Sequence, residues 1–285
     1  MFVRSNVLLE LINSIYVKLP TVLIGDPPLN KVHPTSFIDE TAVLGENIEI
    51  GPFCTVGPGV TIGDNCKLVS HVVLEGKTDI GNDNTFFPFS IIGAEPQDLK
   101  YHGEPTELRI GNGNTFREFA SVHRGTVTGI GETLIGDDNL IMGYVHVGHD
   151  CVIGNSNVLA NYVALSGHVV IDDHAVLGGQ TGVVQFLRIG SYAYIGGASV
   201  IDRNIPPYAM GYGNRLEIKG INIVGLKRRG FSRESIAAIL DAHKLYYRSD
   251  MSEVEALRRI EAEIGDVEEV RLFTSFIREV GGKVH

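Results

Sequence analysis

The feature that most constrains the fold is an apolar residue that recurs at every sixth position over most of the chain. Six matches neither the 3.6-residue period of an α-helix nor the simple alternation of a strand. It is typical of a solenoid in which each hexapeptide forms a short strand and a turn, and three hexapeptides form one coil. The recurring residues, called markers below, are Val32, Ile38, Leu44, Ile50, Val56, Ile62, Leu68, Leu74, Ile80, Phe86 and Ile92, then Ile110, Phe116 and Val122, then Ile135, Ile141, Val147, Ile153, Leu159, Leu165, Ile171, Leu177, Val183, Ile189, Ile195 and Ile201.

This period predicts an all-β parallel β-helix of triangular section, with the markers pointing inward and stacking from coil to coil. Glycine often follows a marker, as Gly51 follows Ile50, and leaves room for the chain to turn a corner. Solenoids of this kind are left-handed, against the usual crossover preference. We expect that hand from the family pattern and not from the spacing.

The chain divides into three parts by its pattern. Residues 1–31 precede the period and predict an extra helix or arm on the body; Glu10, Lys18 and Pro20 interrupt their apolar character. Residues 32–206 form the solenoid. Residues 207–285 predict a C-terminal α-helical domain, because apolar residues fall there at helical spacing.

Capping residues support that helical domain. Ser232 is placed to cap one helix, and Ser252 with Glu255 predicts a capping box for the next. A last helix is expected near Val270–Val280.

Two segments interrupt the period. "DLKYHGEPTELR", residues 98–109, occupies two repeats and returns in phase, whereas "RGTVTGIGET", residues 124–133, shifts the phase by one. Insertions leave a solenoid as loops, and such loops often carry function.

Composition excludes several classes of protein. The formal charge of −10 argues against a general nucleic-acid binder, which needs a basic surface. The three cysteines Cys54, Cys66 and Cys151 have no CxxC spacing, which argues against a disulfide framework or a thiolate zinc site and fits a reducing cytosol. No apolar run reaches the roughly 18 residues that a membrane span needs.

The register gathers histidines on one edge. Val122, Val147, Leu165 and Val183 are expected on the same face of successive coils, about 4.8 Å apart. The residues that follow these markers predict a ladder, with His146 at the corner that enters the face. The ladder consists of His123, His149, His168 and Gln185. Isolated histidines such as His71, His102 and His174 are more often solvated residues.

Three functions fit such a ladder. Acyl transfer needs a general base, which His149 could supply, a group to orient it, such as Asp150, and an oxyanion donor, such as the Gly167 amide. Since no GxSxG motif or reactive cysteine appears, direct transfer is favoured over an acyl-enzyme. A γ-type zinc carbonic anhydrase also uses histidines between subunits, but its close pair is five residues apart, whereas His146 and His149 are three apart. A non-catalytic scaffold is the third alternative.

Six motifs resemble those of a known family: "IGPFCTVGP", "QDLKYHGEPT", "HRGT", "GHDC" in place of "AHDC", "LSGHV" and "NIVGLKRRGFSRE". From about residue 32 to the C-terminus, the chain resembles the UDP-N-acetylglucosamine O-acyltransferases that begin lipid A synthesis. The sister N-acyltransferases carry an N-terminal uridine-binding domain, for which 31 residues are too few.

The resemblance implies a cytoplasmic homotrimer with active sites between adjacent subunits. It implies transfer of a 3-hydroxyacyl chain from acyl carrier protein to the sugar 3-position, with no metal and no cofactor beyond the phosphopantetheine on the carrier. His149 would be the base, Asp150 its orienting group and Gly167 the oxyanion donor. Substrate would contact Gln97, Asp98, Lys100, His123, His146, Asn161, His168, Gln185, Gly197 (at the end of the acyl groove), Asn222, Arg228 and Arg229.

Two positions depart from the family pattern. Val184 stands where relatives have a histidine that touches the substrate, and Val224 stands where a carboxylate is common near the nucleotide. Some relatives act on a 3-amino UDP-sugar and form an amide, which is an alternative reaction. The basic stretch 227–233 provides a local positive patch for a diphosphate and an acidic carrier protein.

Overall fold

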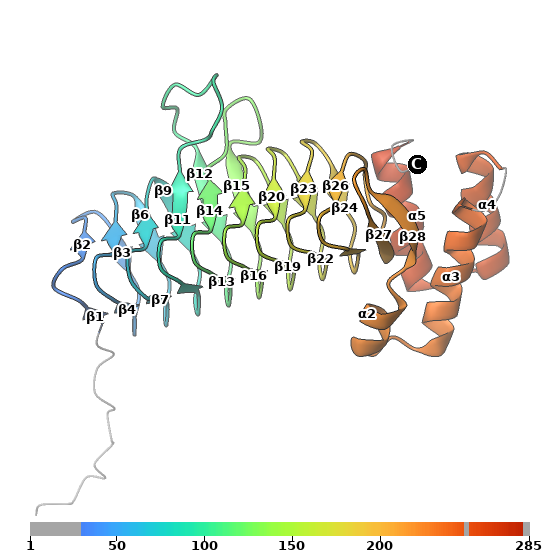
Figure 1. The fold of residues 1–285 in the computed structure, drawn as a ribbon, viewed down its shortest axis with the longest axis horizontal. Coiled ribbons are helices and arrows are strands. Elements are labelled where there is room, and N and C mark those ends of the chain that lie inside the picture. The colour runs from blue at the N-terminus through green and yellow to red at the C-terminus, as the bar shows by residue number, and fades with distance from the viewer. Residues whose placement is uncertain (1–29, 248–250, 282–285) are drawn as a thin grey trace, which may run out of the picture.

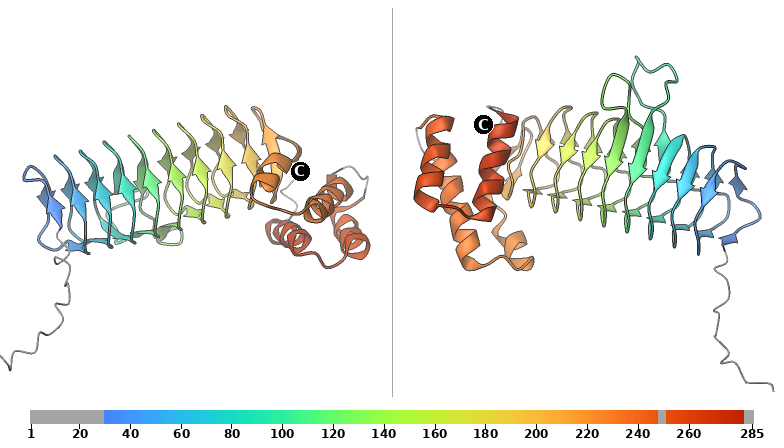
Figure 2. Two further views of the ribbon diagram at one scale, coloured as in Figure 1. Left: turned by 90° about the horizontal axis from the view of Figure 1, so that it is seen from below. Right: turned by 180° about the vertical axis from the view of Figure 1, so that it is seen from behind.

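The computed structural model describes residues 30–247 and 251–281. Three sheets form the sides of a long triangular prism, and a group of helices lies at its C-terminal end (Figure 1; Figure 2). The coils wind left-handed, so the predicted left-handed parallel β-helix with a C-terminal helical region is confirmed. The expected N-terminal arm lies almost wholly outside the described residues.

Each sheet takes one strand from every coil, and neighbouring strands run parallel except for the last pair of sheet A. Sheet A has eleven strands: β1 (Lys31–Val32), β4 (Glu49–Ile50), β7 (Lys67–Leu68), β10 (Thr85–Phe86), β13 (Thr115–Phe116), β16 (Leu140–Ile141), β19 (Val158–Leu159), β22 (Val176–Leu177), β25 (Tyr194–Ile195), β27 (Ala209–Tyr212) and β28 (Glu217–Ile221). Sheet B has nine: β2 (Phe37–Ile38), β5 (Thr55–Val56), β8 (Val73–Leu74), β11 (Ile91–Ala94), β14 (Ser121–His123), β17 (His146–Val147), β20 (Ala164–Leu165), β23 (Gly182–Val183) and β26 (Val200–Ile201). Sheet C has eight: β3 (Val43–Leu44), β6 (Val60–Ile62), β9 (Lys77–Ile80), β12 (Glu107–Ile110), β15 (Glu132–Ile135), β18 (Val152–Ile153), β21 (Val170–Ile171) and β24 (Arg188–Ile189).

The markers fill the interior as the period predicts. Val122, Val147, Leu165 and Val183 pair with one another in that order across sheet B, and all four are buried. Each fully buried aliphatic side chain contributes about 1.5–3 kcal/mol to folding through the hydrophobic effect. The six-residue spacing is therefore stabilised by a continuous column of apolar contacts along the prism.

Where the chain turns between sheets, the third residue after the marker adopts a left-handed backbone conformation in coil after coil. Phe53, Asp150 and His168 show this, with φ values of 59°, 58° and 62°. This conformation is uncommon for residues other than glycine. Its regular recurrence gives each corner two columns of stacked side chains, one from the second and one from the third residue after the marker.

Two corners are named for what they carry. The histidine edge is the corner between sheets B and C, made by residues 148–151, 166–169 and 184–187. The ring edge is the corner between sheets A and B, where six exposed rings stack at centroid distances of 4.7–5.1 Å. The six are Phe53, His71, Phe89, Phe119, Tyr144 and Tyr162.

Both insertions leave the prism at the histidine edge, on consecutive coils, and project together from the body (Figure 1). The first spans 95–106 and the second 124–131, each lying between two strands. The predicted bounds, 98–109 and 124–133, were wrong at their ends because β12 and β15 begin at Glu107 and Glu132. Ile110 nevertheless pairs with Ile135, so the core register survives the shift in phase.

The C-terminal region begins with a hairpin, which the helical pattern did not indicate. β27 extends sheet A by pairing with β25, and β28 folds back on it. The helices follow: α2 (Ile223–Arg228), α3 (Arg233–Tyr247), α4 (Glu253–Ile264) and α5 (Glu268–Val280). Ser232 caps α3 and Ser252 caps α4, as predicted. In the described part of the chain, we find no helix long and apolar enough to cross a membrane.

Candidate active site

The residues that follow the sheet B markers stand in two columns along the histidine edge. His149, Gly167 and Gln185 are each the second residue after a marker, whereas Asp150 and His168 are each the third. His149 and His168 therefore lie on adjacent coils but in different columns, with ring centroids 5.0 Å apart.

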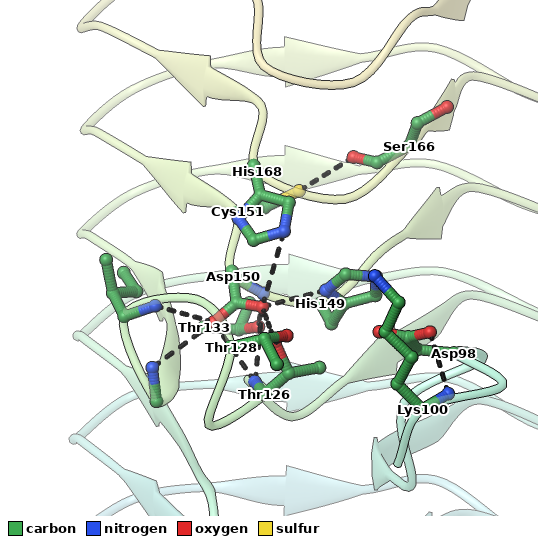
Figure 3. A network of polar contacts seen from close by, with 12 residues as sticks. Asp98, Lys100, Thr126, Thr128, Thr133, His149, Asp150, Cys151, Ser166 and His168 are labelled. Atoms are coloured by element: carbon green, nitrogen blue, oxygen red, sulfur yellow. Dashed lines mark hydrogen bonds and ion pairs between the residues drawn. The ribbon is translucent and has the colours of Figure 1, made fainter.

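Asp150 is held in a cradle of donors from the second loop (Figure 3). Its carboxylate accepts hydrogen bonds from the Thr126 amide at 3.0 Å, the Thr126 hydroxyl at 2.6 Å, and the amides of Ile130 and Gly131 at 3.0 and 3.2 Å. A side chain at Gly129 would collide with the carboxylate. The insertion that breaks the six-residue phase thus wraps around a single carboxylate, whose side chain is fully buried.

His149 Nδ1 lies 2.7 Å from Asp150 Oδ2. An ionised carboxylate can only accept, so Nδ1 carries a proton, and in the neutral imidazole the lone pair is on Nε2. Burial alone would raise the pKa of Asp150, but the Thr126 hydroxyl and His149 hold that pKa below its ordinary value. The His149 side chain is 17 % exposed, so the ring is not sealed inside the protein.

Gly167 lies directly against the His149 ring. A Cβ added there would come within 2.6–3.1 Å of three ring atoms, so no side chain fits while His149 keeps its place. Among the described residues, none accepts a hydrogen bond from the Gly167 amide, whereas the next amide, that of His168, donates to the His149 carbonyl at 2.9 Å. A free donor therefore stands beside the candidate base.

The predicted ladder of four side chains is partly wrong. His168 stacks on Phe186 with ring centroids 4.4 Å apart, not on Gln185, which is exposed. His123 contacts the ring of His146, with centroids 5.1 Å apart. The physical reason is that second and third residues after a marker form separate columns, while His123 and His146 belong to strands of sheet B.

The environment lowers the pKa of two of these histidines. Burial and the neighbouring charges of His123 and His149 lower the pKa of His146 to about 4, and its Nδ1 lies 3.0 Å from the Ser121 hydroxyl. Burial also lowers the pKa of His168, against the opposing charges of Asp150 and Asp98.

The first loop places Asp98 beside His149 (Figure 3), and the Asp98 charge opposes the lowering of the pKa of His168. The Asp98 carboxylate accepts a hydrogen bond from the Lys100 amide at 3.0 Å. The Gln97 and Lys100 side chains are exposed. These three predicted residues therefore share the histidine edge with His149 (Figure 3 shows Asp98 and Lys100 beside it).

Five predicted residues do not lie at this edge within one chain. Asn161 and Gly197 turn the corner between sheets A and B, where the ring edge runs. Arg229 contacts His174 at 2.9 Å, at the corner between sheets C and A. Asn222 caps α2 and donates to the Tyr192 carbonyl, and Arg228 is exposed at the end of α2. The two departing residues, Val184 and Val224, are both exposed.

One group in the described part of the chain could hold a metal ion: donor atoms of His149, Asp150 and His168 lie within 4.8 Å of one another. However, the Asp150 carboxylate already accepts hydrogen bonds from three backbone amides, the Thr126 hydroxyl and His149. A metal bound by all three would displace donors that the second loop supplies. The arrangement suits a base and its orienting acid better than a metal centre.

Sequence reasoning missed Thr126 and Phe186. Phe186 could have been found by writing the third residue after each marker in one column, which places it above His168. Thr126 lies in a loop without periodicity, so no pattern placed it against Asp150.

Comparisons with known proteins agree with this geometry. A family model described as Udp N-acetylglucosamine O-acyltransferase, domain 2, matches residues 204–283, and a model of the bacterial transferase hexapeptide repeat matches residues 41–76 and 132–167. The acyl-[acyl-carrier-protein]--UDP-N-acetylglucosamine O-acyltransferase of Thermodesulfovibrio yellowstonii is 45% identical over 249 residues, 87% of this chain and 96% of that protein.

Solved structures are similar over nearly the same span. LpxA from Acinetobacter baumannii shares 44% identity with a TM-score of 0.86, covering 89% of this chain and 98% of that one. The UDP-N-acetylglucosamine O-acyltransferase of Moraxella catarrhalis shares 42% identity with a TM-score of 0.84, covering 87% and 96%. The chain therefore belongs to the family of UDP-N-acetylglucosamine O-acyltransferases.

Proposed function

We propose that the protein transfers a 3-hydroxyacyl chain from acyl carrier protein to the 3-hydroxyl of UDP-N-acetylglucosamine, the first step of lipid A synthesis. The observation that carries this proposal is the short contact of His149 with Asp150 beside the free amide of Gly167. The names of the similar proteins give the donor and the acceptor.

The geometry supports direct transfer in two stages. Nε2 of His149 takes the proton of the sugar hydroxyl as its oxygen attacks the thioester carbon, and the Gly167 amide donates to the oxyanion. The tetrahedral intermediate then collapses, and the C–S bond breaks. The imidazolium, stabilised by Asp150, returns the proton to the leaving phosphopantetheine sulfur. No step needs a metal or a resident cofactor, since the phosphopantetheine arrives on the carrier.

We also propose that the protein is a homotrimer whose active sites lie between adjacent subunits. A site that uses His149 together with Asn161, Gly197 and Arg229 is incomplete in one chain, because these residues lie at three different corners. The nine strands of sheet B contain no Lys, Arg, Asp or Glu, unlike sheets A and C. The exposed ring edge borders that sheet, and an exposed apolar patch of this kind is typical of a subunit interface.

Mixing two inactive variants tests the shared site. His149→Ala protein and Gly197→Trp protein, unfolded together and refolded, would form random trimers, which are assayed with the long 3-hydroxymyristoyl donor that the tryptophan blocks. If each site takes His149 from one subunit and Gly197 from the next, about a quarter of the sites are intact. Recovery of roughly that share of activity supports the shared site, and no recovery in trimers of confirmed mixed composition contradicts it.

The reaction itself is tested by mass spectrometry of products formed from both UDP-N-acetylglucosamine and its 3-amino analogue, with a series of hydroxyacyl carrier proteins. Predominant amide formation would favour the 3-amino alternative. Stoichiometric zinc whose removal abolishes turnover would favour the carbonic-anhydrase-like alternative. The free, buried cysteines Cys54, Cys66 and Cys151 and the carrier-protein donor support a cytoplasmic location.

A further inference from the structure

Arg124 is a buried cation that the proposed reaction does not use. The residue is 8 % exposed and directly follows β14. Its guanidinium donates to the Gly93 carbonyl and, at 3.2 Å, to the Tyr101 hydroxyl; no carboxylate of the described residues pairs with it. Burying a cation is costly unless its donors are satisfied. An arginine here therefore has a more specific use than filling space.

Its partners lie at the root and in the middle of the first loop. The Arg124 amide donates to the Ala94 carbonyl at 3.0 Å, and His123 Nδ1 lies 2.6 Å from the Glu95 carbonyl. Two consecutive residues thus hold three consecutive carbonyls, those of residues 93–95. The Tyr101 hydroxyl donates in turn to the Glu104 carbonyl at 2.9 Å, which extends the anchor into the loop.

The coil below is shaped to admit the guanidinium. Gly76 has a φ of 65°, and a Cβ added there would collide with the Arg124 side chain. Gly93, whose carbonyl accepts from Arg124, has a φ of 85° and is packed against Glu75 and Thr78. The space is therefore a built pocket for one planar cation, bounded by two glycines and the tyrosine hydroxyl.

The segment that contains Arg124, residues 123–126, also holds the carboxylate of Asp150 in the candidate active site. Thr126, two residues after Arg124, donates both its amide and its hydroxyl to Asp150. Residues 123–126 therefore connect the first loop on one side to the His149–Asp150 pair on the other. A displacement of this segment would move the substrate-contacting loop and the base relative to each other.

We propose that Arg124 is a positioning residue, which fixes the 95–106 loop through Gly93 and Tyr101 so that Asp98 and Lys100 hold the sugar nucleotide in register with His149. This inference rests on the proposed function, in which that loop contacts the acceptor. Arg124 does not touch the substrate; it acts through the loop.

Three variants test the anchor. Tyr101→Phe removes one hydroxyl, Arg124→Lys keeps a cation that can reach the Gly93 carbonyl but cannot also bridge to Tyr101, and Arg124→Met removes both bonds. Arg188→Met is the matched control, since Arg188 also spans two elements by pairing with Asp172 and Glu279, but far from the loop.

The amide hydrogen exchange rate of residues 95–106 measures how firmly Arg124 holds this loop, and it does not depend on enzyme activity. Exchange should quicken in all three variants and most in Arg124→Met, while Arg188→Met leaves it unchanged. In a double variant, the effects of Tyr101→Phe and Arg124→Lys on the exchange rate should not be additive, because each substitution alone already removes the hydrogen bond between residues 101 and 124. Wild-type exchange in Arg124→Met would overturn the inference.

Kinetics separate positioning from a merely structural role. The KM for the sugar nucleotide should rise about tenfold in Arg124→Met, the effect of losing hydrogen bonds that order a binding loop. The kcat should stay within about twofold, and the KM for the acylated carrier should not change. Faster exchange with an unchanged KM would overturn the positioning role. An unchanged KM in Lys100→Met would instead contradict the loop's proposed contact with substrate, whatever the anchor does.

Discussion

The histidine edge and the ring edge share one backbone geometry and differ in what covers them. His71 and His168 occupy the same place in their hexapeptides, with φ values of 52° and 62°. His71 lies exposed between the rings of Phe53 and Phe89. His168 lies beside Asp150, which the second loop holds, and its side chain is 20 % exposed.

The difference lies in the insertions and not in the repeat. Each corner offers the same two positions per coil, and stacking alone yields a column of rings. At the histidine edge, loop 124–131 adds donors to Asp150, and loop 95–106 brings the charge of Asp98 to the column. A repeated backbone thus supplies sites for side chains, while the inserted segments add the donors that hold Asp150 against His149.

The largest contrast between the edges should appear on removing a histidine from each. His149→Ala should lower kcat by about 10²–10⁴, the range for a general base, with the fold intact. His71→Ala should leave kcat within about twofold. The measurement is steady-state turnover, with circular dichroism to confirm folding. Comparable losses in the two variants would remove the distinction between the edges.

A second contrast lies along the corner of the ring edge. The last stacked ring is Tyr162, and the equivalent positions in the next two coils are Gln180 and Ala198, which carry no ring. Gly197, beside Ala198, should leave room for the end of a long acyl chain. Gly197→Met should displace about four methylenes, each worth about 0.8 kcal/mol, and so disfavour 3-hydroxymyristoyl against 3-hydroxydecanoyl carrier protein by a factor of order 10² in kcat/KM.

The control for that variant is Gly197→Ala, because a Cβ at this position lies 3.0 Å from the Gly179 carbonyl in either case. Alanine adds the same backbone contact without filling the groove, so it should keep the preference for the long chain. Equal losses for both donors in the methionine variant would place Gly197 away from the end of the groove.

The third contrast compares two carboxylates at corners. Asp150→Asn should lower the free energy of unfolding by about 1–3 kcal/mol, because an amide nitrogen faces buried donors that need an acceptor. Asp173→Asn should change it by less than about 0.5 kcal/mol. Asp173 ends a column built of Asp and Asn side chains, and its Oδ1 accepts from the Asn155 backbone amide at 2.6 Å, which an Asn oxygen can also do. Urea denaturation of both variants gives the two values.

The smallest effect concerns pH. His146 has a pKa lowered to about 4 by burial and by His123 and His149, so it stays neutral in the folded protein while the unfolded chain takes up a proton below about 6.5. Its contribution is therefore constant above pH 6.5 and falls as pH drops from 6.5 toward 4. His146→Gln should flatten this part of the stability curve relative to the wild type, measured as urea midpoints at pH 7 and pH 5. Parallel curves would contradict the shift.

The sequence predicted the prism well because a six-residue period determines both the sheet and the face of every marker. The pairing of Val122 with Val147 follows directly once the loop between them is removed. The order within the histidine edge was harder, since the second and third residues after a marker point along different columns. Sorting them separately would have placed Phe186 over His168 and left Gln185 in the column of His149.

The donors around Asp150 could not be predicted. Thr126, Ile130 and Gly131 lie in a segment without repeat or secondary structure, and their positions depend on how that loop closes over the carboxylate. The placement of the predicted site residues at three different corners was predictable in principle. Asn161 and Gly197 follow markers of sheet A, whereas His149 and Gly167 follow markers of sheet B.

The survival of the core register across both insertions has an evolutionary consequence. Because β12 still pairs with β9 and β15 still pairs with β12, the strand register of the prism does not depend on how many residues the loops contain. During evolution, these loops can become longer or shorter without a change in the pairing of the strands on either side of them. A change of loop length therefore alters the histidine edge while the strand register of the prism stays unchanged.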